Sequence, residues 1–288
     1  MTVTVSGRTR VCAVIGDPIE HSLSPIIQNA AFNALNINCV YTAFKVKSSD
    51  VANVLAGIRV LGFLGLNVTM PHKETVIAHV DWIDETVKCL NSINTIHHKD
   101  GKLLGYSTDG IGALRALREN GADPHGKRVL ILGAGSTARA IAYALIQETD
   151  ELVVLNRTVT EAEKLSEALK RKYDKKVSAG SLSSEVIKEK IRDSNILLNT
   201  TSVGMSPNIN QSLVSSNDLK SDLAVMDIVY NPRETQLAKD AKAVGAKVVS
   251  GVEMLIYQGA AAFEIWTGQQ APVQVMRRAV LEQNVVGV

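Results

Sequence analysis

The chain has few cysteines, and they lie far apart. Cys12, Cys39 and Cys89 form no Cys-x-x-Cys pair and no Cys/His cluster. Disulfide frameworks are typical of small secreted proteins, and closely spaced cysteines are typical of zinc sites. We therefore expect three buried, reduced thiols in a cytoplasmic protein that holds no metal.

The sequence also lacks long apolar runs and a marked charge of one sign. No run is long enough to span a bilayer, and the polar N-terminus has no signal-peptide core. The net charge is +2, from 31 basic and 29 acidic residues, so charge gives no reason to expect a nucleic-acid or membrane partner. A small molecule is the expected partner.

Apolar residues, in contrast, are plentiful. They make up 45% of the 288 residues, and charged residues make up 21%, as is usual for globular proteins. This length predicts one large or two medium domains.

One stretch in the middle of the chain has the order strand, tight turn, helix, strand. Val129 to Leu132 is a short apolar run, as expected of a buried parallel strand. Gly133 permits a sharp turn, Gly135 lets the backbone approach a pyrophosphate, and Ala138 permits close packing. The helix over about 136–147 would direct its N–H groups at the phosphates. This context predicts a dinucleotide-binding unit.

The end of its second strand indicates which dinucleotide. NAD sites usually carry Asp or Glu there, whereas this chain has Asn156-Arg157-Thr158. An arginine with a neighbouring hydroxyl can bind a 2′-phosphate, so we predict NADP over NAD. Two readings weaken this prediction: Arg157 could be an ordinary surface residue, and Glu161, four residues on, could pair with it.

The N-terminal third has the pattern of a second α/β unit. Strands are expected over 11–15, 40–46 and 64–68, with helices over about 26–35 and 50–61. This alternation predicts a mostly parallel sheet, which binds ligands beyond the carboxyl ends of its strands.

Polar residues follow the first of these strands. Ser24 suits the N-cap of the next helix and Pro25 its first position. A cap does not explain Ser22, and two hydroxyls at a helix N-terminus suit a carboxylate.

Asn67, Thr69 and Lys73 follow the third strand. Lys73 is either a solvated lysine or a residue with a special role, since a cation is electrostatically misplaced at a helix start. Asp109, at the start of a later helix, is either its N-cap or a carboxylate of the site.

The remaining chain is divided by turn signals. The segment Lys99-Asp100-Gly101 predicts a hairpin turn. Residues 74–88 are expected to form a helix that is broken near 80–84. The polar segment over 121–127 predicts a domain boundary. Further strands are expected over 195–200, 223–229 and 246–250, and further helices over 160–173, 235–244, 251–266 and 272–283.

Taken together, the motifs resemble those of the shikimate dehydrogenase family across nearly the whole chain. Each is weak alone, and the set in this order is specific. They are Ser22-Leu-Ser24-Pro25, Asn67-Val-Thr69-Met-Pro71-His-Lys73, Ile93-Asn94-Thr95, Thr108-Asp109-Gly110, Gly133-Ala134-Gly135, Asn156-Arg157-Thr158, Thr201-Ser-Val203-Gly204-Met205, Tyr230-Asn231-Pro232 and Gln258-Gly259.

The resemblance implies a two-domain α/β fold. Residues 1–110 with 252–288 would form a substrate-binding, catalytic domain with a mostly parallel sheet, and 111–251 a Rossmann domain for NADP. It also implies reversible reduction of 3-dehydroshikimate to shikimate by NADPH, a step of chorismate and aromatic amino-acid biosynthesis, by a monomer or homodimer.

The resemblance further implies roles for particular residues. The acid/base pair would be Lys73 and Asp109. The expected substrate ligands are Ser22, Ser24, Thr69, Lys73, Asn94, Asp109, Tyr230 and Gln258. The expected cofactor ligands are Gly133, Ala134, Gly135, Ser136, Thr137, Asn156, Arg157, Thr158, Thr201, Val203, Met205, Ile228, Gly251 and Met254.

Some positions depart from the family pattern. Ser136-Thr137 replaces a Gly-Ala pair after the glycine turn, Asn91-Ser92 replaces another, and Ser107 replaces an asparagine. Glu161 stands where many NADP-binding members carry a second basic residue.

Three alternatives stay open. A quinate/shikimate dehydrogenase with relaxed substrate and NAD/NADP use is the nearest. A catalytically silent NADP-binding protein is disfavoured because Lys73 and Asp109 are both present. Another oxidoreductase, such as a methylenetetrahydrofolate dehydrogenase, is disfavoured by the serine pair and Gln258.

Overall fold

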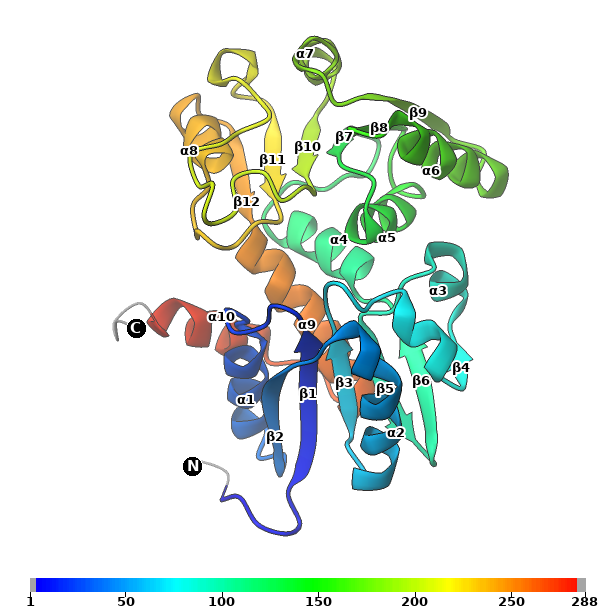
Figure 1. Ribbon diagram of the computed structural model, residues 1–288. Coiled ribbons are helices and arrows are strands. Elements are labelled where there is room, and N and C mark those ends of the chain that lie inside the picture. Colours follow the sequence, from blue (N-terminus) through cyan, green and yellow to red (C-terminus); the bar gives the residue numbers. More distant parts are fainter. Residues whose placement is uncertain (1–3, 284–288) are drawn as a thin grey trace. The chain divides into compact units, whose positions relative to one another are not determined.

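The computed structural model describes residues 4–283, which divide into two compact units (Figure 1). One unit runs to Thr108 and resumes at Leu255, and the other spans Asp109–Met254. The expected boundary over 121–127 is wrong, because this segment joins a helix to a strand inside the second unit.

The first unit contains a mixed sheet of six strands in the order β2-β1-β3-β5-β6-β4. β1 is parallel to β2 and β3, and β5 is antiparallel to β3 and β6. Its elements are β1 (Arg10–Gly16), α1 (Ser24–Ala34), β2 (Cys39–Lys45), α2 (Val51–Leu61), β3 (Gly65–Val68), β4 (Trp82–Ile83), α3 (Glu85–Leu90), β5 (Thr95–Lys99), β6 (Lys102–Tyr106), α9 (Gly251–Thr267, from 255 onward) and α10 (Val273–Glu282).

Side-chain alternation along β1 assigns a helix layer to each face of this sheet. Ala13 and Ile15 join a core cluster with Leu55 of α2, so Cys12 and Val14 point to the opposite face. There α1 and α9 pack together, with the Phe32 and Phe263 ring centroids 5.3 Å apart. The two faces therefore enclose separate halves of the core.

The expected burial of the cysteines holds for two of the three. Cys12 and Cys39 are buried with their sulfurs 3.8 Å apart, whereas Cys89 is half-buried. All three are free thiols.

The second unit contains six parallel strands in the order β12-β11-β10-β7-β8-β9. This is the doubly wound order of a Rossmann sheet, with its switch point between β7 and β10. The elements are α4 (Asp109–Glu119), β7 (Arg128–Leu132), α5 (Ser136–Leu145), β8 (Glu151–Asn156), α6 (Val159–Lys172), β9 (Lys176–Ser181), α7 (Ser184–Arg192), β10 (Ile196–Asn199), β11 (Ala224–Asp227), α8 (Gln236–Ala243) and β12 (Lys247–Ser250).

Two of these elements, β9 and α7, were not expected from the sequence. β9 is an edge strand in which Val177 is the buried apolar residue. α7 buries only Ile187 and Ile191. β9 therefore gives a weak alternating signal, whereas α7 is amphipathic but only nine residues long.

The segment 74–88 is also more broken than expected. Thr75–His79 is a single 3₁₀ helix, and β4 follows it. Asp84 then caps α3 by accepting a hydrogen bond from Val87 N at 2.7 Å. The hairpin is confirmed: Asp100 and Gly101 have φ of 51° and 75°, as a two-residue turn between β5 and β6 requires.

The packing of β3 under α9 generates a stability prediction. A Cβ on Gly65 would overlap the indole of Trp266, whose Nε1 donates to Ile96 O at 2.9 Å. Gly65→Ala should lower the free energy of unfolding by about 1–3 kcal/mol, as overpacking does. Gly57→Ala, in α2 with open space around it, should raise it by about 0.5–1 kcal/mol. Urea denaturation measures both, and equal effects would contradict this packing.

Candidate functional site

The loops that follow β1 and β3 are tied together at the carboxyl edge of the first sheet. Thr69 N donates to Ile15 O at 2.9 Å, and Asp17 N donates to Met70 O at 3.0 Å. The loop carrying Thr69 and Lys73 therefore lies beside the segment that leads to Ser22.

Buried contacts fix the turn that carries Lys73. His72 is fully buried, with Nε2 2.7 Å from Val46 O. Ile93 N donates to Lys73 O at 2.8 Å, which places the Lys73 backbone beside the segment that leads into Asn94. No role was expected for His72, because its partner follows β2, 26 residues away in the sequence.

The two serines after β1 are in contact. Ser24 N donates to Ser22 Oγ at 3.3 Å. The expected capping role of Ser24 is wrong: α1 begins at Ser24, its N-cap is Leu23, and no side chain caps it.

Asn94 is the best-anchored side chain among the expected ligands. Its Oδ1 accepts from Thr108 N at 2.8 Å and from Thr95 Oγ1 at 3.0 Å. Its Nδ2 donates to Thr108 Oγ1 at 2.9 Å and lies 3.4 Å from Gln258 Oε1. This side chain is only 3% exposed, so its orientation is set by the protein before any ligand binds.

The first unit thus brings six expected substrate ligands to one edge of its sheet, and two belong to the second unit. The six are Ser22, Ser24, Thr69, Lys73, Asn94 and Gln258. Asp109 is the first residue of α4, directly after Thr108, and is 6% exposed. Tyr230 follows β11, and burial raises the pKa of its phenol.

In the second unit, the glycine turn after β7 has the geometry the sequence predicted. Gly133 has φ of 108°, and its N–H donates to Leu155 O at 2.7 Å. A Cβ on Gly133 would lie 2.6 Å from Thr200 Oγ1, so only glycine fits. Gly135 is the N-cap of α5, no side chain caps this helix, and a Cβ there would meet no protein atom. The helix start is therefore suited to hold phosphate.

A buried carboxylate organises the ends of β10 and β11. Asp227 accepts hydrogen bonds from Asn199 Nδ2 at 3.0 Å, Val229 N at 3.1 Å and Thr235 Oγ1 at 2.7 Å. Burial raises the pKa of Asp227 despite these donors. Asn199 Oδ1 in turn accepts from Thr201 Oγ1 at 2.7 Å, so the loop over 200–205 is held by the strand beneath it.

The residues expected to bind the 2′-phosphate of NADP lie at the end of β8. Asn156 Nδ2 donates to Thr158 O at 3.0 Å, and Thr158 is the N-cap of α6 without capping it through its side chain. Glu161 pairs with Lys164 at 2.8 Å. Lys164, and then Arg139 of α5, lower the pKa of Glu161.

The ion-pair partner of Glu161 is thus Lys164, whereas the sequence suggested Arg157. Neither Lys164 nor Arg139 was assigned a role from the sequence. Arg139 lies on α5, four residues after Gly135, and Glu161 lies on α6. Because the two residues are far apart in the sequence, the effect of Arg139 on Glu161 was not predicted.

All the expected cofactor ligands follow strands of one parallel sheet. They lie at or beyond the carboxyl ends of β7, β8, β10, β11 and β12. Dinucleotides bind at this edge in doubly wound sheets. The glycine turn, the uncapped α5 and the cations near β8 together fit NADP.

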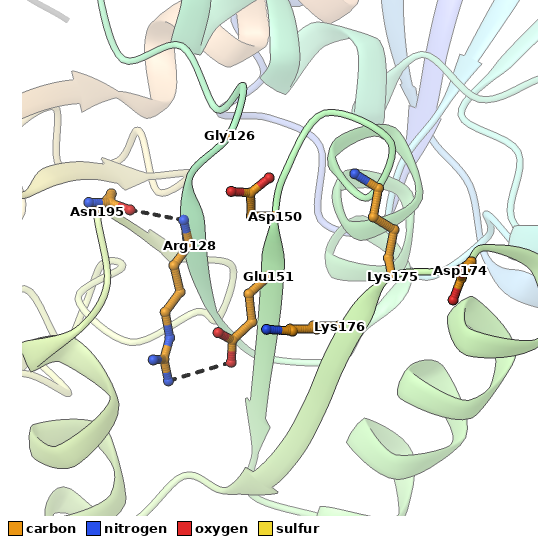
Figure 2. A pocket seen from close by; sticks show the side chains of 8 residues that line it. All are labelled: Gly126, Arg128, Asp150, Glu151, Asp174, Lys175, Lys176 and Asn195. Atoms are coloured by element: carbon orange, nitrogen blue, oxygen red, sulfur yellow. Dashed lines mark hydrogen bonds and ion pairs between the residues drawn. The ribbon is translucent and has the colours of Figure 1, made fainter.

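A separate hollow of about 500 Å³ lies at the opposite, amino edge of the same sheet (Figure 2). Its walls carry three cationic and three anionic side chains, and Arg128 Nη2 lies 3.6 Å from Glu151 Oε1. The charges balance within the walls, and we assign no ligand to it. The lining residues are Gly126, Arg128, Asp150, Glu151, Asp174, Lys175, Lys176 and Asn195.

Residues 4–283 contain no group of three His, Cys, Asp or Glu that could hold a metal ion. Over the same residues, no helix has the length and apolar character needed to cross a membrane.

Comparison with known proteins decides the family. Residues 14–96 match the shikimate dehydrogenase substrate binding domain, 116–249 the shikimate/quinate 5-dehydrogenase domain, and 251–281 the shikimate 5′-dehydrogenase C-terminal domain. The chain belongs to the shikimate dehydrogenase family.

Relatives that match nearly the whole length of the chain support the same family. The chain is 47% identical to shikimate dehydrogenase (NADP(+)) of Methanopyrus kandleri, over 98% of both chains. It is similar to a crystal structure of shikimate dehydrogenase with NADP+, at 40% identity, a TM-score of 0.91 and 98% of both chains. It is also similar to shikimate 5-dehydrogenase of Listeria monocytogenes with shikimate and NAD, at 35% identity and a TM-score of 0.90, over 97% of this chain and 99% of the other.

The carboxylate beneath the nucleotide edge generates a prediction. Asp227→Asn places an NH₂ group against one of three donors, so it should lower the free energy of unfolding by about 1–3 kcal/mol. Asp222→Asn is the matched control, since Asp222 is exposed and should have almost no effect. Urea denaturation distinguishes them, and an unchanged midpoint for Asp227→Asn would show that the three donors do not need the carboxylate.

Proposed function

We propose that this protein is an NADP-dependent shikimate dehydrogenase, which reversibly reduces 3-dehydroshikimate to shikimate with NADPH. The observation that carries most weight is the whole-length match to relatives of that name. The NADP-fitting edge of the second sheet supports it, as do the polar groups gathered in the first unit.

The polar groups of the first unit suit a small polyhydroxylated acid. We propose that Ser22 and Ser24 bind the carboxylate together with Tyr230, because hydroxyls at a helix start favour an anion. Thr69, Asn94 and Gln258 would bind ring hydroxyls, since a preset amide discriminates hydroxyl positions well.

The second unit would hold the cofactor. Gly133, Ala134, Gly135, Ser136 and Thr137 would surround the pyrophosphate, and Asn156, Arg157 and Thr158 the 2′-phosphate. The loops after the remaining strands would line the nicotinamide end, through Thr201, Val203, Met205, Ile228, Gly251 and Met254.

Ketone reduction needs a proton on oxygen as carbon accepts a hydride. Bound NADPH would supply the hydride. The Lys73 ammonium would stabilise the negative charge growing on the oxygen and then protonate it. The Asp109 carboxylate would orient this ammonium.

A quinate/shikimate dehydrogenase that also uses NAD is the alternative. The Listeria relative crystallised with NAD favours it, as does Glu161 in place of a second basic residue. We further propose a cytoplasmic protein, consistent with three free thiols, that is a monomer or a homodimer.

The reaction itself is tested by initial rates of cofactor reduction. We expect turnover with shikimate and NADP, and rates at least tenfold lower with quinate or NAD, because a missing or extra polar contact in a closed site is costly. Comparable rates with quinate or NAD would favour the alternative, and no reaction in any combination would overturn the proposal.

Lys73→Ala tests the proton donor. We expect kcat to fall by about two to four orders of magnitude, the usual contribution of a general acid, with little change in shikimate affinity. Lys88→Ala, at an exposed position of α3, is the control. Near-normal turnover of Lys73→Ala, measured with folded protein, would remove Lys73 from the mechanism.

The charges near β8 test cofactor choice. Arg157→Ala should raise the KM for NADP by about tenfold or more and leave the KM for NAD unchanged, because only NADP carries the 2′-phosphate. Lys164→Ala should raise the KM for NADP by only about two- to fivefold, since its pair with Glu161 is exposed and screened. Lys170→Ala, farther along α6, should change neither. Equal increases in the KM for NADP and in the KM for NAD would show that these side chains do not bind the 2′-phosphate.

A further inference from the structure

A buried glutamine joins the two helices that carry Ser24 and Gln258. Gln28 lies on α1, one turn after Ser24, and is 1% exposed. Its Nε2 donates to Gly259 O at 2.8 Å, and Gly259 directly follows Gln258 on α9. One hydrogen bond therefore connects the supports of two expected substrate ligands.

The contacts between α1 and α9 define how the two helices are aligned. Phe32 and Phe263 lie four residues after Gln28 and Gly259 respectively, and their ring centroids are 5.3 Å apart. Because a step of one turn along both helices leads from one contact to the next, α1 and α9 run in the same direction.

The same step backwards leads to the expected substrate ligands. It leads from Gln28 to Ser24 on α1, and on α9 to Leu255, whose carbonyl accepts from Gln258 Nε2 at 2.8 Å. Gln258 Oε1 lies 3.4 Å from Asn94 Nδ2. The register of α1 against α9 therefore sets how far Ser24 stands from the Gln258 amide.

The Gln28 amide adds little to the stability of this contact. Gly259 O can only accept, so Nε2 of Gln28 must face it and Oε1 must point elsewhere. Oε1 is buried, and residues 4–283 offer it no hydrogen-bond donor. An unpaired buried carbonyl costs at least as much stability as one hydrogen bond contributes. An apolar side chain would serve stability equally well.

A directional bond does, however, fix the register of an otherwise apolar contact. Ala31 and Phe32 of α1 are fully buried, as is Phe263 of α9. A Cβ on Gly259 would lie only 3.3 Å from Gln28 Nε2, so glycine suits this close approach. Single buried polar residues set the register of paired helices at a cost in stability. Gln28 has the same properties.

We propose that Gln28 is a positioning residue for substrate binding, which fixes the register of α1 against α9 and thereby the separation between Ser24 and Gln258. This inference rests on the proposed function. The carboxylate and a ring hydroxyl of the substrate must fit that separation. Gln28 itself would touch neither substrate nor cofactor.

The test is Gln28→Leu, which removes the directional bond and keeps an apolar side chain in the contact. We expect the KM for shikimate to rise by about tenfold, the usual effect of one lost hydrogen bond. The kcat and the KM for NADP should be nearly unchanged, since uniform binding is lost. The urea midpoint should stay or rise, because the unpaired Oε1 is removed as well. Gln28→Met, whose flexible chain fills the same space, should behave alike.

A double-mutant cycle separates positioning from general packing. In the Gln258→Ala background, Gln28→Leu should raise the KM for shikimate by less than about twofold, because the side chain that it positions is absent. Gln274→Leu is the matched control. It makes the same change at an exposed position of α10 and should alter no constant.

An unchanged KM for shikimate in Gln28→Leu would overturn the inference. So would the full tenfold effect in the Gln258→Ala background. A lowered urea midpoint in both the Leu and the Met variant, or equal increases in the KM for shikimate and for NADP, would show that Gln28 only stabilises the fold, and would also overturn it. Absence of shikimate turnover by the unaltered protein would instead overturn the proposed function, so the two failures are distinguishable.

Discussion

Buried amides and carboxylates must find hydrogen-bond partners without water, and this requirement shapes the polar ends of both sheets. Asn67, Asn94, Asn199 and Asp227 are all at most 7% exposed. An unpaired group of this kind costs about 1–3 kcal/mol. Each is satisfied by groups on neighbouring strands or by the loop that follows its strand, which gives that loop a single low-energy arrangement.

The two units use this requirement in parallel ways. In the first, Asn67 and Asn94 join β3, β5 and the segment ending in Thr108, so the groups proposed to bind substrate stand on a rigid base. In the second, Asn199 and Asp227 join β10 and β11 and shape the loops proposed to line the nicotinamide. Flexible ligand loops would lose entropy on binding. Rigid ones leave more of the interaction energy for orientation, and catalysis depends on orientation.

Much of this could be predicted from local sequence. Val129 to Leu132 marks a buried strand, and the positive φ of Gly133 follows from the turn that a glycine there permits. The Asp100-Gly101 hairpin follows the same logic. Features that depend on distant partners were not predicted: Tyr41 meets Asn67 from 26 residues away, and Asn199 meets Asp227 from 28. Ser24 was expected to cap the following helix, but the helix begins at Ser24 itself and its N-cap is Leu23.

We propose that preset polar groups of the first unit bind a polyhydroxylated acid, and that the carboxyl edge of the second sheet binds NADP. A crystal structure with shikimate and NADP bound tests it most directly. We expect the carboxylate at Ser22 and Ser24, ring hydroxyls at Asn94 and Gln258, and the 2′-phosphate at Arg157. Shikimate bound in the reverse sense, with its carboxylate at Lys73, would contradict it.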